Sequence, residues 1–207
     1  MATLAPSFRD FLPAWVAVQP WYRGSGLPSL ALAGTYRLED PAGEVGIETH
    51  LVRDGTTTYQ VPMTYRGAPL AAAGDHAGTG TPTLIVVAEH SELGTRWIYD
   101  AEGDPVWRGA ITRLVRDGRT VESRADDGDV IIAVTGHPLN TAGLAGSPAI
   151  ELRRVLAPGE PAGGPPAGAA GLVMGTWRAG CFRAPGTETV TGCLAVLRVW
   201  PCSAPDC

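Results

Sequence analysis

Apolar and polar side chains alternate along residues 44–52, which is the pattern of an antiparallel strand buried on one face. One face carries Val45, Ile47, Thr49 and Leu51, and the other carries Glu44, Glu48 and His50. Asp54-Gly55 supplies a hairpin turn after this strand. In the return strand, one face carries Tyr59, Val61, Met63 and Tyr65. Pro62 lacks a ladder donor and therefore predicts an edge or a bulge.

Two helices and two more strands are predicted in the first half of the chain. Ser7 and Asp10 have capping-box spacing, but Pro13 removes a backbone donor, so we expect a short or kinked first helix. Apolar or alternating residues predict strands at 84–88 and 95–100. Asp104 as N-cap, followed by Pro105 at the first helical position, begins a second helix, and the turn sequence Asp117-Gly118 ends it.

The second half of the chain is predicted to be mostly β-structure. Short strand patterns occur at 120–124, 130–134, 150–156, 172–178 and 194–200. Residues 157–170 contain four prolines and four glycines, which predicts a mobile loop because such a segment buries little apolar surface. The patterns allow either two domains, 1–116 and 117–207, or one continuous domain.

Composition excludes several classes of protein. With 44% hydrophobic and 18% charged residues, the chain is typical of a globular protein. No apolar run approaches the ~20 residues of a membrane span, and the N-terminus lacks a signal-peptide pattern, so we expect a soluble, cytoplasmic protein. The net charge is −5 and the basic residues form no stripe, which argues against a nucleic-acid partner.

Three stretches of the sequence resemble a known family. They are Leu12-Pro13-Ala14-Trp15 with Gln19-Pro20-Trp21-Tyr22; residues 36–48 with 59–67; and Glu89-His90-Ser91-Glu92-Leu93-Gly94 with 96–101 and 104–106. They are similar to the maltokinase N-terminal cap-like proteins of actinobacteria, some of which are labelled 1,4-alpha-glucan branching protein. The resemblance covers residues 8–116 well and the rest loosely.

The resemblance implies a fold and a metabolic setting, but no reaction. It implies an α+β, cystatin-like cap, in which a curved antiparallel sheet packs on a helix, here followed by a mostly β C-terminal half. In full maltokinases such a cap precedes a kinase body, and that body phosphorylates maltose with ATP. The nucleotide and sugar sites belong to that body, so the resemblance assigns no catalytic residue to this chain.

Phosphoryl transfer requires a cation on the nucleotide phosphates, a metal-binding acid and an aligned base. All 16 basic residues are arginine, so the chain has no phosphate-binding lysine, and it lacks H-x-D and D-F-G motifs. We therefore expect no enzyme activity and no cofactor. His90-Ser91-Glu92 could supply a base or a hydrogen-bonded corner, and the corner is favoured because the groups are merely adjacent in sequence.

Metal and disulfide sites are not predicted. Residues 126–129 lack the spacing of a calcium loop, and His50, His76 and His137 each stand without a second ligand. The cysteines have no C-x-x-C pair, and in the cytoplasm free thiols are expected, although a hairpin could bring Cys181 and Cys193 together. The other two cysteines are Cys202 and Cys207.

The candidate interaction face consists of Tyr59, Tyr65, Trp97 and Tyr99. Aromatics on a curved sheet could anchor a partner or stack on sugar rings, although core packing is the commoner role at alternate strand positions. The first hypothesis is a non-catalytic accessory module that binds a protein, such as a kinase or carbohydrate-active enzyme of glycogen, maltose or trehalose metabolism. The alternatives are a carbohydrate or small-molecule binder using the concave sheet, and an enzyme with an unrecognised site. A pocket with converging polar groups would favour the alternatives.

Overall fold

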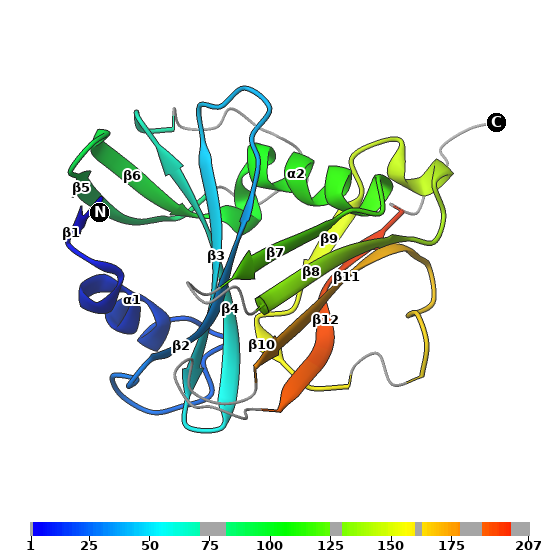
Figure 1. Ribbon diagram of the computed structural model, residues 1–207, viewed down its shortest axis with the longest axis horizontal. Coiled ribbons are helices and arrows are strands. Elements are labelled where there is room, and N and C mark those ends of the chain that lie inside the picture. The colour runs from blue at the N-terminus through cyan, green and yellow to red at the C-terminus, as the bar shows by residue number, and fades with distance from the viewer. Residues whose placement is uncertain (1, 71–81, 125–129, 160–162, 179–187, 200–207) are drawn as a thin grey trace.

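The computed structural model describes residues 2–70, 82–124, 130–159, 163–178 and 188–199. In this part of the chain, two antiparallel sheets and two α-helices make up an α+β fold, as predicted (Figure 1). The first sheet has the order β1-β5-β6-β4-β3-β2, with β10 beside β4, and the second has the order β7-β8-β11-β12-β9.

The strands of the first sheet come mainly from the first half of the chain. They are β1 (Leu4–Ala5), β2 (Ala31–Leu38), β3 (Gly46–Asp54), β4 (Thr57–Arg66), β5 (Leu84–His90), β6 (Gly94–Asp100) and β10 (Val155–Leu156). The predicted hairpin is confirmed, because β3 and β4 pair antiparallel on either side of Gly55, which has a positive φ of 58°. The pattern missed β1 and β2, neither of which was predicted.

Pro62 lies in the interior of the first sheet, not at a sheet edge. On one side of β4, Pro62 is opposite Thr49 of β3. On the other side, β10 pairs with β4 only up to Tyr59, and β6 begins its pairing at Met63. Among the described strands, Pro62 therefore has no partner on this second side of β4, where a missing backbone donor is tolerated as it is at a sheet edge.

The second sheet contains the strands predicted in the second half, with changed ends. They are β7 (Thr120–Arg124), β8 (Val130–Pro138), β9 (Ala149–Leu152), β11 (Ala169–Arg178) and β12 (Thr189–Arg198). The segment 150–156 is not one strand, because Arg153 and Arg154 separate β9 in the second sheet from β10 in the first. Two 3-10 turns, η1 (Ala101–Gly103) and η2 (Ala142–Leu144), complete the regular structure of the described residues.

Helix α1 (Phe8–Ala17) begins at the predicted capping residues. The Asp10 carboxylate accepts hydrogen bonds from the Ser7 backbone N–H at 2.8 Å and from its hydroxyl at 2.6 Å. The helix is short, as predicted, and it continues past Pro13 because its apolar residues pack on the first sheet. That cluster joins Phe11, Leu12, Trp15 and Val16 to residues of β3, β4, β5 and β6.

Helix α2 (Pro105–Arg116) has the predicted N-cap, and the structure adds a buried ion pair to it. Asp104 is completely buried and accepts from the backbone N–H of Val106 at 2.9 Å. Its carboxylate also binds the Arg66 guanidinium through two hydrogen bonds, at 2.9 and 2.7 Å, and accepts from the Thr64 hydroxyl at 2.8 Å. The start of α2 is thereby joined to the end of β4.

Both faces of the first sheet are covered, so the half-buried pattern predicted for β3 is wrong. Ile47, Thr49 and Leu51 are buried on one face, but His50 and Val52 are buried on the other. Figure 1 shows α1 on one side of this sheet and α2, with the second sheet, on the other. The larger core cluster contains residues from β2, β3, α2, β8, β11 and β12, and therefore includes residues from both sides of position 116.

Several predictions fall on residues outside the described ranges. These are the turn at 126–129, His76, Cys181, Cys202 and Cys207, together with residues 160–162 of the predicted loop. Cys193 is described and is buried in β12. Among the described residues, no helix is both long enough and apolar enough to cross a membrane.

Candidate ligand-binding pocket

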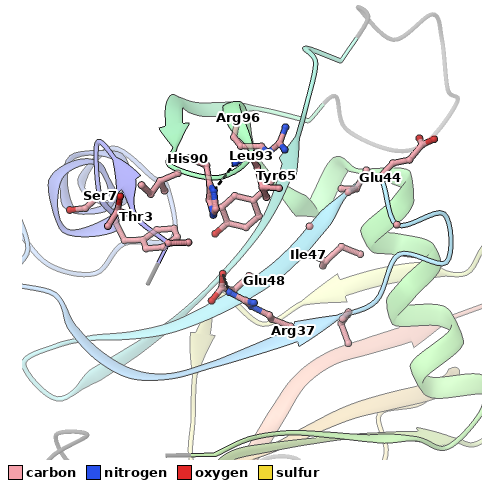
Figure 2. A pocket seen from close by; sticks show the side chains of 17 residues that line it. Thr3, Ser7, Arg37, Glu44, Ile47, Glu48, Tyr65, His90, Leu93 and Arg96 are labelled. Carbon is pink, nitrogen blue, oxygen red and sulfur yellow. Dashed lines mark hydrogen bonds and ion pairs between the residues drawn. The ribbon is translucent and has the colours of Figure 1, made fainter. Parts of the chain in front are cut away.

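A pocket of about 780 Å³ opens where the N-terminal segment meets the first sheet (Figure 2). Its wall contains residues of β1, the start of α1, the end of β2, the start of β3, β4 and the β5–β6 hairpin. This volume lies within the range of roughly 300–1,000 Å³ that is usual for small-molecule sites. The polar side chains that line it include Arg37, Glu48, Tyr65, His90 and Arg96.

Glu48 is the carboxylate on the inner wall of the pocket, with a side chain that is 15% exposed. Its oxygens lie 3.5 Å from the guanidinium of Arg37 and 3.5 Å from Nε2 of His50. Burial raises the pKa of this carboxyl, but the neighbouring His50 imidazole and Arg37 guanidinium outweigh burial and leave the pKa below its ordinary value. Glu48 is therefore ionised at neutral pH.

Tyr65 of β4 presents its ring and hydroxyl to the same pocket. The ring packs edge-on against Phe8, with 6.2 Å between ring centroids. The hydroxyl lies 3.9 Å from Sδ of Met63, which is a weak acceptor. Burial, followed by the charge of Glu48, raises the pKa of Tyr65 well above its ordinary value, so the phenol keeps its proton.

His90 ends β5 and forms the hydrogen-bonded corner favoured in the sequence analysis. Its Nδ1 accepts the backbone N–H groups of Glu92 and Leu93, each at 3.2 Å. The Ser91 hydroxyl accepts from the backbone N–H of Thr3, which ties this corner to the N-terminal segment at 3.0 Å. Because Nδ1 acts as an acceptor, the neutral imidazole carries its proton on Nε2.

Apolar residues contribute to the shape of the pocket. The apolar residues of the lining include Phe8 and Leu93, together with Leu38, Val45 and Ile47, which also belong to the larger core cluster. The Phe8 ring also packs on the buried imidazole of His50, with 4.3 Å between ring centroids. Helix α1 therefore covers His50, which lies two positions after Glu48 on β3. In the view of Figure 2, the Tyr65 hydroxyl lies between the His90 ring and the Glu48 carboxylate.

The structure divides the four aromatics of the predicted interaction face between the two faces of the sheet. Tyr65 is opposite Ile98, whereas Trp97 is opposite Arg66 and Tyr99 is opposite Thr64, so Trp97 and Tyr99 lie on the face away from Tyr65. Tyr59 shares the face of Tyr65 but is 1% exposed, with its ring packed against Trp21 and Tyr22. Only Tyr65 of these four lines the pocket.

The polar residues around Tyr65 were not identified from the sequence as a site. Glu48 and His50 were assigned to a solvent-facing strand side, and Arg37 and Arg96 lie in stretches that carry the family resemblance but were given no role of their own. They converge because β2, β3, β4 and the β5–β6 hairpin are neighbours in one curved sheet. His90 had been considered as a possible base or hydrogen-bonded corner, because Ser91 and Glu92 follow it in the sequence. No pattern along the chain could have joined it to Glu48, which precedes it by 42 positions.

Comparison with known proteins identifies the region that holds most of this pocket. Residues 15–104 match the family model described as the maltokinase N-terminal cap domain. The match includes β2 to β6 and ends at the N-cap of α2. No curated protein and no solved structure matches the chain significantly.

Proposed function

Because residues 15–104 match the family model of the maltokinase N-terminal cap domain, we propose that this chain is a maltokinase-associated accessory module that binds a small polar molecule without transforming it. The observation that carries this proposal is the pocket, in which polar groups from separate strands converge between apolar walls.

We expect a small-molecule ligand of this pocket to raise the melting temperature of the protein. A ligand at 100 times its Kd stabilises the native state by about 2.7 kcal/mol, which corresponds to roughly 5–10 °C for a chain of this size. Differential scanning fluorimetry against neutral, cationic and anionic metabolite-like compounds would measure the shift. Failure of all three classes to stabilise the protein would contradict the proposed function.

A bulky side chain at the pocket wall provides the control. Leu93 lines the pocket and is 59% exposed, so Leu93→Trp should obstruct the pocket without disturbing the core. Leu139 is similarly exposed and lies outside the pocket lining, which makes Leu139→Trp the matched variant. We expect the ligand-induced shift to disappear in the first variant and to persist in the second. An equal loss in both variants would place binding elsewhere.

We also expect no specific binding of Mg-ATP. The sequence has no lysine and no recognisable phosphate cradle, and a kinase needs a cation on the nucleotide phosphates together with metal-binding acids. Isothermal titration calorimetry with Mg-ATP would test this expectation. A stoichiometric isotherm with low-micromolar affinity would contradict the non-catalytic assignment, whereas flat heats would support it.

A second candidate function is contact with a protein, such as a kinase or another carbohydrate-active enzyme. The family match favours this candidate. The name of the matched family describes an N-terminal cap of a larger enzyme, and such a cap would contact protein. The variant at Leu93 separates the two candidates. A partner recovered equally well by the native chain and by Leu93→Trp would favour protein contact through another surface, and loss of that partner would place the pocket mouth in the interface.

A further inference from the structure

The pocket offers one strong hydrogen-bond acceptor that is incompletely used. An ionised carboxylate has lone pairs for about four hydrogen bonds and cannot donate. The contacts of Glu48 with Arg37 and with Nε2 of His50 are both 3.5 Å long, and the Arg37 side chain is 80% exposed. A short hydrogen bond from a ligand donor would therefore improve the surroundings of this largely buried charge.

Among the hydrogen-bond donors that line the same pocket are Tyr65 and His90. The Tyr65 hydroxyl carries its proton and has the weakly accepting Sδ of Met63 as its hydrogen-bond partner in the described structure. The His90 imidazole holds its proton on Nε2 because Nδ1 accepts two backbone N–H groups. Figure 2 shows these donors on the same side of the pocket, above the Glu48 carboxylate.

This combination of groups discriminates between ligand chemistries. An alkylammonium group can donate to Glu48 but cannot accept from Tyr65 or His90. A phosphate can accept from Tyr65 and His90, but its oxygens would meet the charge of Glu48. A hydroxyl group both donates and accepts, so it can satisfy the carboxylate and a donor together.

The charges around the pocket favour a neutral ligand. Arg37 and Arg96 carry two positive charges, and Glu44 and Glu48 carry two negative charges, so the formal charges of these lining residues cancel. The apolar surfaces of Phe8 and Leu93 flank the polar groups and suit the carbon face of a ring.

From these groups we infer that the pocket takes a neutral, hydroxyl-rich ligand, with a hydroxyl held between Glu48, Tyr65 and His90. The inference rests on the proposed function, because it names the chemical class of the small molecule that the pocket binds. A single-ring polyol and the end of an oligosaccharide chain share this chemistry. The test below includes a probe for each.

Isothermal titration calorimetry on the full chain tests the inference with five probes. Glucose and myo-inositol represent single neutral rings, and maltose represents a chain of two. Choline represents a cation, and inorganic phosphate represents an anion. We expect at least one neutral probe to bind more tightly than both choline and phosphate. Preference for glucose over maltose would indicate a single-ring ligand, and the reverse preference would indicate a chain end.

Two substitutions test the residues that hold the hydroxyl. Glu48→Gln keeps the shape of the side chain and removes the ionised acceptor, and Tyr65→Phe keeps the ring and removes the donor. Each should weaken binding of the neutral probe about tenfold or more. Loss of one hydrogen bond to a charged or buried group reduces the binding free energy enough to raise the Kd by about that factor. Glu122→Gln on β7, outside the pocket lining, is the matched control and should leave the affinity unchanged.

The outcomes separate this inference from the proposed function. Tighter binding of phosphate or choline than of every neutral probe would overturn the inference and leave a small-molecule pocket in place. Neutral binding that neither Glu48→Gln nor Tyr65→Phe weakens would also overturn it. Melting curves of both variants show whether either substitution unfolds the protein. If Glu48→Gln is unstable, Tyr65→Phe still tests the inference. Absence of stabilisation by every class in the fluorimetry screen would defeat both proposals.

Discussion

A chain that ends at Arg116 should fail to form a cooperative native state. Residues that the first half contributes to the larger core, among them Leu51, Trp107 and Ile111, pack in one cluster with Trp177 and Leu194 of the second sheet. Removal of residues 117–207 would expose this surface to water, and burial of apolar area contributes about 25 cal/mol per Å². The loss would exceed the marginal stability of roughly 5–15 kcal/mol that is usual for a whole domain.

Polar contacts between the halves would be lost as well. The buried Gln60 side chain donates to the backbone oxygens of Arg153 and Leu194, at 3.1 and 3.0 Å, and accepts from the Tyr36 hydroxyl at 3.1 Å. Arg154 binds the carboxylates of Asp100 and Glu102. Truncation would leave a buried amide with unsatisfied donors and two acidic side chains without their cation.

Circular dichroism during urea unfolding, with the full chain as the control, would measure the effect of truncation. We expect the fragment 1–116 to show no cooperative transition and to bind a hydrophobic dye. A sigmoidal transition with native-like near-ultraviolet dichroism would contradict this expectation. It would support the alternative that residues 1–116 are a separate domain.

Asp104→Ala should be more damaging than substitution of any polar residue that lines the pocket. It removes both oxygens that pair with Arg66, the acceptor for Thr64 and the N-cap of α2. Loss of one partner from a buried ion pair costs about 3–5 kcal/mol, because the other charge stays in a poorly solvated position. Loss of an N-cap alone costs only about 1 kcal/mol. The ion pair is therefore the larger part of the effect.

Two companion variants separate the contributions at Asp104. Asp104→Asn keeps an oxygen for the backbone N–H of Val106 and removes the charge, so it should lose the ion pair but retain the cap. Asp117→Ala changes an exposed carboxylate at the other end of α2 and should change stability little. Urea midpoints for the three variants would give the comparison. Equal midpoints for Asp104→Ala and Asp117→Ala would contradict the role assigned to the buried pair.

The elements with local signals were predicted correctly. The hairpin of β3 and β4 was identified from alternation and Asp54-Gly55, and the start of α2 from Asp104 and Pro105. These signals are local because turn conformation and helix capping depend on residues a few positions apart. β2 was missed because its pattern is weak: Ala33 and Gly34 interrupt the alternation, and the register shifts between Leu32 and Gly34.

Burial on the second face of a strand depends on what packs there, and no local pattern contains that information. His50 has the polarity of a solvent-facing residue, yet α1 covers it with Phe8. Gln60 and Thr64 lie on the face of β4 that the sequence pattern marks as polar and exposed. In the structure they are buried, and their hydrogen-bond partners lie in β2, in β12 and at the start of α2. Tertiary hydrogen bonds compensate for their burial, so hydrophobic periodicity misplaces them.

The sequence by itself determined the α+β class, the hairpin, both helix starts, the end of α2 and the family resemblance, because each depends on short-range chemistry or on residue identity. Only the tertiary structure decided which polar groups meet. Glu48, Tyr65 and His90 belong to three different strands, and the order β5-β6-β4-β3 brings them to one pocket. Such convergence depends on strand order and sheet curvature, which are long-range properties that result from the packing of α1, α2 and the second sheet.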